Sequence, residues 1–268
     1  MNDTELLLPH LRDLARRTFE GDYETSTGFL GLAEQAAFFT AQRKENPQRR
    51  DVFAGVPFLL WGGTPEAERR ILVFLPSYQD PEGFLEHEKT DASLIVPIAV
   101  RPRGPRFAEE LTHRDFLGAL MHLGITRDRI GDIAVRPDGS GAVLFALRDI
   151  CEVVTGELTR VRHTAVEASI LANAAVDICP VFEERSGSVA SERLDAVLAL
   201  AFRLSRDKAK ELVLRELVFV DGLPALSPDQ ALRPGVRVSA RGFGKFVYDG
   251  PAATSKKGRL IVRLRIYK

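Results

Sequence analysis

Residues 94–168 alternate between strand-like and helix-like hydrophobic patterns, and this alternation constrains the fold more than any other feature of the chain. Six runs follow one another, of which the second and fifth have helical spacing and the others are short apolar runs: 94–100, 112–123, 130–135, 142–147, 149–158 and 160–168. The order βαββαβ is that of the split βαβ, ferredoxin-like arrangement, in which two helices cover one face of an antiparallel sheet. We therefore predict a ferredoxin-like domain here.

The same architecture underlies four-stranded RNA-recognition (RRM) modules, in which bases stack on aromatic side chains of the exposed sheet face. In this chain, the strands that would carry such aromatics offer only Phe145. We therefore predict an RRM-like topology without predicting base stacking on this sheet.

The residues before this domain show a different pattern. Leucines recur at helical spacing between residues 6 and 14, and a second helical run follows at 29–42. Apolar runs at 57–61 and 70–75 flank the sequence Gly-Gly-Thr-Pro and predict a hairpin. The pattern indicates a small α/β domain.

A polar stretch at 76–90 is the first predicted junction, and the Cys-Pro pair at 179–180 marks the second. The sequence thus predicts an α+β protein with three domains, at 1–85, 86–180 and 181–268.

The net charge of the chain is zero, with 37 Lys and Arg against 37 Asp and Glu, but the two signs are separated along the chain. Residues 1–188 hold 21 basic and 29 acidic residues, whereas 189–268 hold 16 basic and 8 acidic ones. This asymmetry predicts a basic module that binds polyanions, attached to an acidic remainder.

The basic module begins, after a polar run at 183–188, with two predicted helices. Ser191 is placed to cap the first, which has an apolar face from Leu194 to Ala201, and Ser205 is placed to cap the second, at 206–214. Strands are then predicted at 217–220, 236–241, 246–248 and 259–266. The helix starts lie beside clustered Arg and Lys, a combination that favours phosphate binding.

The spacing of these elements resembles the S4-type RNA-binding domain, an αL-type motif. The resemblance rests on four sequence stretches: Arg193-Leu194-Asp195, 204–210, 218–222 and 232–238. Two positions depart from the family pattern. The chain has Arg215-Glu216 where a glycine is usual, and Gly235-Val236 where Gly-Asp is usual.

Further stretches resemble the YlmH-type RNA-binding proteins of bacteria. They are His113 to Met121, Leu123 to Ile125, Ile130 to Ile133 and Arg241 to Phe246. The resemblance implies an N-terminal α/β domain, a ferredoxin-like RNA-binding middle domain and a C-terminal S4-type domain. It also implies binding to ribosomal RNA of the large subunit and to tRNA, in the rescue and quality control of stalled ribosomes.

The candidate RNA-binding residues are cations of the basic module, one capping serine, and two residues of the middle domain: Arg193, Arg203, Ser205, Arg206, Lys208, Lys210, Arg241, Lys245, Lys256, Lys257, His113 and Arg114. The sequence Arg193-Leu194-Asp195 resembles the catalytic aspartate loop of pseudouridine synthases, but in this chain a helical run follows Asp195. We expect Asp195 to be a structural partner of a nearby cation or amide.

No catalytic or metal-binding pattern stands out. The five histidines are scattered, and the two cysteines, Cys151 and Cys179, are not in metal-ligand spacing. His113-Arg114-Asp115 imitates a kinase loop but lacks its asparagine, since Leu120 stands there. We therefore expect a cytoplasmic protein with no enzymatic activity, no cofactor and no membrane span.

Two alternatives stay open. One is an RNA-modifying enzyme, similar to a pseudouridine synthase, that uses the S4-type domain for delivery. The other is an adaptor linked to cell division, since YlmH-type proteins are encoded beside cell-division genes. Protein contacts through the acidic N-terminal domain are compatible with either.

Overall fold

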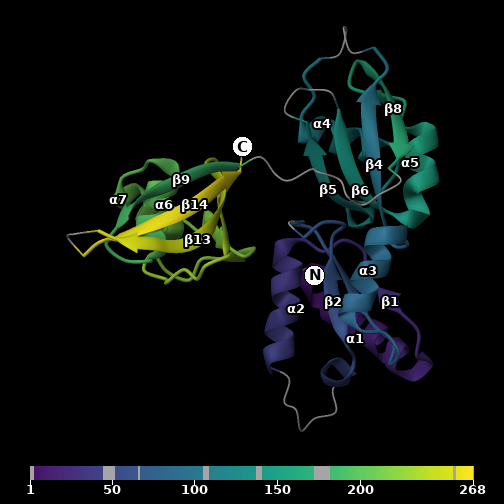
Figure 1. Ribbon diagram of the computed structural model, residues 1–268, viewed down its shortest axis with the longest axis horizontal. Helices are drawn as coiled ribbons and strands as arrows, with labels where there is room; N and C mark the ends of the chain where they lie inside the picture. The colour runs from purple at the N-terminus through teal and green to yellow at the C-terminus, as the bar shows by residue number, and fades with distance from the viewer. Residues whose placement is uncertain are drawn as a thin grey trace. The chain divides into compact units, whose positions relative to one another are not determined.

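The computed structural model describes residues 3–44, 52–65, 67–104, 109–136, 141–171, 182–255 and 258–267. The chain divides into two compact units, Met1–Cys179 and Pro180–Lys268. Three antiparallel sheets and their helices build them, which confirms the predicted α+β class (Figure 1).

The first sheet lies in the N-terminal part of the first unit, where the predicted helices and hairpin are confirmed. Its strands pair in the order β1-β3-β2. The elements are α1 (Asp3–Gly21), β1 (Thr25–Ser26), α2 (Leu32–Lys44), β2 (Phe58–Trp61) and β3 (Ile71–Phe74). Phe38, Phe53 and Phe74 pack edge to face or stacked in the core between helices and sheet, with ring centroids 5.5 to 6.5 Å apart.

The stretch 76–90, in which we predict the first junction, contains helix α3 (Pro81–Asp91). Asp80 caps this helix, because its carboxylate accepts a hydrogen bond of 2.7 Å from the Gly83 amide, and Pro81 occupies the first helical turn. Phe84 and Glu88 are buried. Sequence reasoning did not identify this helix, because a largely polar helix needs only one buried face.

The second sheet has the order β5-β6-β4-β8-β7, with every neighbouring pair antiparallel. Its elements are β4 (Ile95–Pro102), α4 (His113–His122), β5 (Ile130–Val135), β6 (Ala142–Leu147), α5 (Cys151–Glu157), β7 (Arg160–Val161) and β8 (Thr164–Ile170). Phe116 of α4 and Val154 of α5 share one core with Ile98 and Leu144 of the sheet. The predicted order of strands and helices is therefore observed.

The last predicted strand, 160–168, was wrong as a single element. Arg162 has a φ of 51° and turns the chain, so that β7 and β8 form a tight hairpin in which Val161 pairs with Thr164. Arginine gives no sequence signal for such a turn, because glycine and asparagine are the usual residues there.

The opposite face of this sheet is covered by the N-terminal part of the unit. Phe145 is only 2% exposed and belongs to a cluster with Trp61, Ile71 and Phe84. A second connection is polar: the Asp132 carboxylate accepts hydrogen bonds from the amides of residues 68 and 69, at 2.6 and 3.1 Å. Because it is buried, Phe145 cannot stack on a base. The domain boundary that we predict at residue 85 stays a prediction.

The C-terminal unit has a six-stranded sheet in the order β11-β10-β12-β13-β14-β9. Its elements are β9 (Phe182–Val189), α6 (Leu194–Phe202), α7 (Arg206–Leu214), β10 (Val218–Val220), β11 (Leu223–Pro224), β12 (Arg237–Ala240), β13 (Gly244–Thr254) and β14 (Leu260–Tyr267). Both helices pack on one face of the sheet, where Val197, Leu212, Val238 and Phe246 share a core.

Two expectations for this unit were wrong. The polar run 183–188 belongs to β9, an edge strand that pairs with β14 along its whole length, from Phe182 opposite Tyr267 to Val189 opposite Leu260. An edge strand with one exposed face tolerates polar residues. Ser191 does not cap the first helix, because α6 begins at Leu194 and Arg193 is its N-cap residue. The second cap was right, since the Ser205 hydroxyl accepts a hydrogen bond of 3.2 Å from the Lys208 amide.

The departure from the S4-type pattern at Arg215-Glu216 leaves the turn geometry intact. Glu216 has a φ of 56°, its amide donates to the Val213 carbonyl, and the Leu217 amide donates to the Leu212 carbonyl, both at 3.0 Å. These two bonds form a Schellman motif, whose left-handed residue is usually glycine.

We expect Glu216→Gly to raise the free energy of unfolding of this unit by about 1 kcal/mol, because a non-glycine residue in the left-handed region is strained. Chemical denaturation followed by circular dichroism measures the change. Glu216→Ala removes the same charge but keeps the strain, so an equal gain in that variant would contradict the backbone explanation.

Candidate nucleic-acid interface

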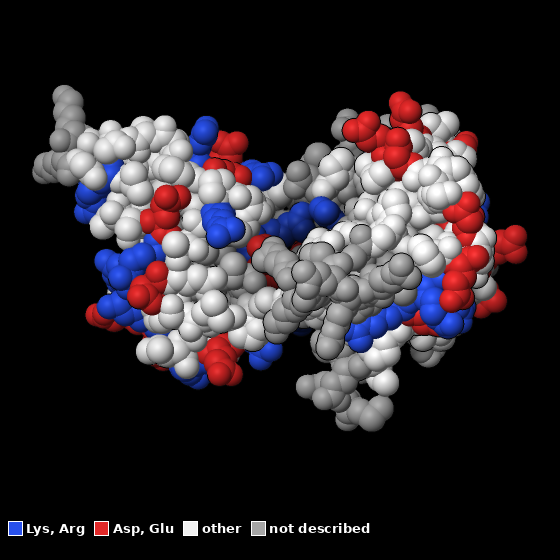
Figure 2. Space-filling model, turned by 90° about the horizontal axis from the view of Figure 1, so that it is seen from below, with Lys and Arg blue, Asp and Glu red and all other residues white. Residues whose placement is uncertain are grey.

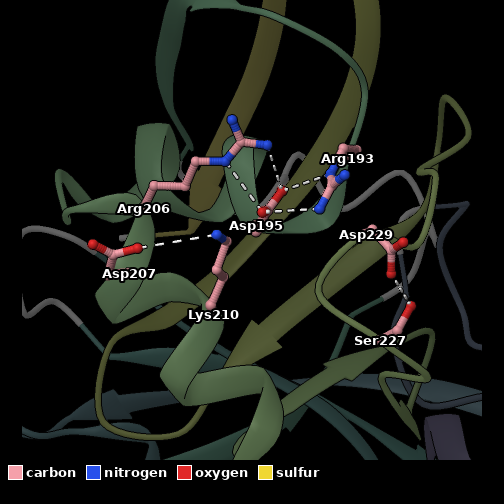
Figure 3. Close-up of polar contacts among 7 residues, drawn as sticks. All are labelled: Arg193, Asp195, Arg206, Asp207, Lys210, Ser227 and Asp229. Carbon is pink, nitrogen blue, oxygen red and sulfur yellow. Dashed lines mark hydrogen bonds and ion pairs between the residues drawn. The ribbon is translucent and has the colours of Figure 1, made fainter.

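The helix pair of the C-terminal unit is organised around one buried carboxylate. Asp195, in the first turn of α6, has a fully buried side chain and accepts hydrogen bonds from Arg193 at 3.2 and 3.3 Å and from Arg206 at 3.1 and 3.3 Å. Figure 3 shows the carboxylate between the two guanidinium groups, one from the start of each helix. Our expectation that Asp195 is a structural partner of a nearby cation is confirmed.

Burial alone would raise the pKa of Asp195, but hydrogen bonds and charge from Arg206 and Arg193 outweigh it and hold that pKa below its usual range. The carboxylate therefore stays ionised and fixes both guanidinium groups, whose side chains remain 40% and 45% exposed. A fully buried Asp195 is not placed to react with a nucleoside, unlike a catalytic aspartate.

The other predicted cations of the helix pair differ in their partners. Lys208 forms an ion pair of 2.9 Å with Glu211, and Lys210 lies 4.0 Å from the almost fully exposed Asp207. Exposed surface pairs of this kind contribute little to stability, which leaves both lysines available to an incoming phosphate.

Arg203 lies between the two helices with a φ of 53°, and it is exposed. It forms no ion pair with any residue that the structure describes. An arginine in the left-handed region costs about 1 kcal/mol in backbone strain, and a glycine would fit there. The fold therefore does not explain why a cation stands at this position.

The start of α6 is not the phosphate-binding helix terminus that we expected. The Leu194 amide donates to the Gln230 carbonyl and the Asp195 amide to the Pro228 carbonyl, both at 2.9 Å. These amides are the ones that would face an anion. At this terminus, cationic side chains are therefore the groups that remain for phosphate.

The predicted contacts at 241–245 surround the turn between β12 and β13. The Arg241 guanidinium lies 5.0 Å above the Phe219 ring, and Lys245 is exposed at the start of β13. Phe243 is 40% exposed and packs against Phe202 at the end of α6, with 6.0 Å between ring centroids. Lys256 and Lys257 lie outside the described residues.

The last two predicted contacts, His113 and Arg114, are exposed in the first turn of α4, in the other compact unit. The Asp115 carboxylate in the same turn caps α4 by accepting hydrogen bonds from the Thr112 amide and hydroxyl, at 2.8 and 2.7 Å. In this unit, burial raises the pKa of Cys151 to about 11, which disfavours the thiolate form at neutral pH. Cys179 lies outside the described residues.

Sequence reasoning missed Arg185 of β9, which donates to the Ala201 carbonyl and so caps the C-terminal end of α6. It also missed Arg265, which pairs with Asp249 at 3.0 Å and lies over the Phe182 ring. The alternation of basic and apolar residues along 259–266 was a usable signal for cations on one sheet face.

On the face drawn in Figure 2, basic and acidic side chains are mixed. In the view of Figure 2, Lys and Arg atoms lie close to Asp and Glu atoms in most places where they gather.

None of the helices among the described ranges combines the length and the apolar character needed to cross a bilayer.

A family model, a curated relative and a solved structure are similar to this chain. The family model described as "Putative RNA-binding domain in YlmH" matches residues 102–173. The ribosome-associated protein quality control protein P2 of Bacillus subtilis (strain 168) is 32% identical over 200 residues, which cover 72% of this chain and 71% of that protein. A solved structure, the cell division protein ylmH from Streptococcus pneumoniae, aligns with a TM-score of 0.46 at 17% identity, over 64% of this chain and 92% of that chain. Because the 32% identity extends over more than two thirds of both sequences and the family's own domain lies within it, the chain belongs to the YlmH family.

Proposed function

We propose that the protein is a non-enzymatic RNA-binding factor of ribosome-associated quality control, which engages large-subunit ribosomal RNA and tRNA in the bacterial cytoplasm. The observation that carries this proposal is the Asp195 cluster, in which one buried carboxylate fixes two half-exposed guanidinium groups, and Lys210 follows four residues after Arg206 on α7. Fixed guanidinium groups suit phosphate oxygens, because little side-chain entropy is lost on binding.

The relative from Bacillus subtilis supports the biological setting, since its name places it in ribosome-associated quality control. In the finer assignment we propose, residues 1–85 form an α/β domain, 86–180 a ferredoxin-like RNA-binding domain, and 181–268 an S4-type RNA-binding domain. The S4-type domain supplies the main phosphate contacts, through Arg193, Arg206, Lys208 and Lys210. We propose further phosphate contacts through Arg241, Lys245, Lys256 and Lys257.

Sedimentation of the full chain with purified ribosomal subunits tests this function. We expect the protein to travel with large subunits at moderate salt and to dissociate as salt rises, because counterions are released when cations contact phosphates. Small subunits are the control. Equal binding to both subunits, or none to the large one, would overturn the proposal.

Incubation with ribosomal RNA and tRNA followed by nucleoside analysis tests the non-enzymatic role. We expect an unchanged nucleoside composition. A new modified nucleoside that depends on the protein would favour the RNA-modifying alternative.

A further inference from the structure

An open basin of about 510 Å³ lies on the helical face of the second sheet, in the unit that does not contain the Asp195 cluster. It is bounded by the exposed side of α4, the end of α5 and strand β7. The lining residues that matter here are Arg114, Gly118, His122, Glu157, Arg160 and Arg162. The position matters because the opposite face of this sheet, where RRM modules bind bases, is closed over Phe145.

Three arginines line this basin, and they are held in different ways. Arg162 is paired with two carboxylates, since its Nε lies 3.7 Å from Glu109 and 3.8 Å from Asp115. Arg114 and Arg160 are exposed, and within the described part of the chain neither forms an ion pair. Glu157 is the acidic residue that opposes them, since Asp115 is engaged in capping α4. Two cations are therefore available to an anion that enters the basin.

Gly118 is an independent indication of a ligand. It lies inside α4, where glycine is less favourable than alanine, and a Cβ atom added there would meet nothing within 4 Å. Packing within the protein therefore does not require glycine at this position. Because Gly118 lines the basin, its missing side chain lets a ligand backbone approach the helix closely.

We propose that this basin binds the sugar-phosphate backbone of RNA, with Arg114 and Arg160 contacting phosphate oxygens over the open basin at Gly118. An open basin with cations along its rim suits a chain that passes across it. The inference rests on the proposed RNA-binding function and adds a second contact surface, on the helical face of the middle domain.

The test compares full-length variants for binding to a fluorescein-labelled RNA hairpin and to large ribosomal subunits. Gly118→Gln places a longer side chain in the basin and is compatible with a helix. Gly156→Gln is its matched control, because Gly156 is also a helical glycine at which an added Cβ atom would meet nothing within 4 Å, and it does not line the basin. We expect both variants to be at least as stable as the wild type in thermal unfolding. Only Gly118→Gln should lose RNA affinity, by about tenfold.

Charge changes supply a second readout that loss of folding cannot imitate. Arg160→Glu should weaken RNA binding about tenfold, and Glu157→Gln should strengthen it about twofold, because the first removes a phosphate contact and the second removes a repulsive charge. Lys210→Glu, in the other unit, separates this inference from the proposed function.

If Lys210→Glu weakens RNA binding while the Gly118, Arg160 and Glu157 variants bind as the wild type, the basin inference is wrong and the proposed function stands. If none of the four variants alters RNA binding, both are wrong. Binding of adenosine monophosphate and of inorganic phosphate is measured in the same way. Binding of either one that is lost in Arg160→Glu, with RNA binding unchanged, would assign the basin to a small phosphate ligand and overturn the RNA proposal.

Discussion

Reversing the charge at Arg203 and Lys210 together is expected to weaken RNA binding about 100-fold and to lower the slope of log K against log salt by about two units. Each residue presents an exposed or half-exposed cation on the helix pair, Arg203 at the end of α6 and Lys210 on α7, and Lys210 lies 4.0 Å from its partner Asp207. Each lost phosphate contact removes about one released counterion from the binding equilibrium. Fluorescence titration of labelled RNA at several salt concentrations measures both quantities.

Arg206 is a poor choice for this experiment, although it is a predicted phosphate contact. Glutamate there would face Asp195, which is fully buried and ionised, so that loss of binding and loss of folding could not be told apart. Arg203 and Lys210 avoid this difficulty.

The matched control is the reversal of Arg16 and Arg17 on α1. Both are exposed, and the net charge of the protein changes by the same amount. We expect a small effect, from long-range electrostatics alone. If the two double variants weakened RNA binding equally, overall charge and not the helix pair would account for affinity.

Asp195→Asn is expected to lower the free energy of unfolding of the C-terminal unit by about 2 to 3 kcal/mol. The substitution keeps the shape of the side chain but removes the charge that holds two guanidinium groups. The loss stays below that of a fully buried ion pair, because the two arginines are 40% and 45% exposed and water can solvate them. Native-state hydrogen exchange of amides in α6 and α7 reports the change for this unit alone.

The same variant has a distinct pH dependence. The pKa of Asp195 is lowered in the folded protein, so its stabilising contribution is fully present above the unfolded-state pKa and is lost as the pH falls through the folded-state pKa. The stability of the wild type should therefore fall more steeply than that of Asp195→Asn below about pH 4. Parallel curves for the two proteins would show that the carboxylate contributes no net stability.

Much of the fold could be predicted because its signals are local. The bounds of β5 and β6 follow from short apolar runs, and α7 follows from a capping serine and a helical pattern. Strand β9 could not be predicted in this way, because its polar residues become a strand only by pairing with β14, which is distant in sequence. The hairpin at Arg162 was missed for a similar reason, since neighbouring elements impose its backbone conformation.

The candidate site shows the same division. Sequence reasoning named Arg193, Asp195 and Arg206 and gave Asp195 a structural role, but only the fold shows that one carboxylate joins both arginines. The basin was beyond sequence reasoning, because Arg114 and Arg160 lie on separate elements and the meaning of Gly118 depends on the empty space beside it. Whether these residues contact RNA stays a prediction.

The pairing of β9 with β14 has a consequence for how this protein is made. The first strand of the C-terminal unit has β14 as its hydrogen-bonded neighbour, and β9 also carries Arg185, which holds the end of α6. During synthesis, β9, α6 and α7 leave the ribosome long before residues 260–267 do. The sheet behind the helix pair can therefore close only after β14 has left the ribosome, and a chain cut short before that strand would leave β9 without its hydrogen-bonded neighbour.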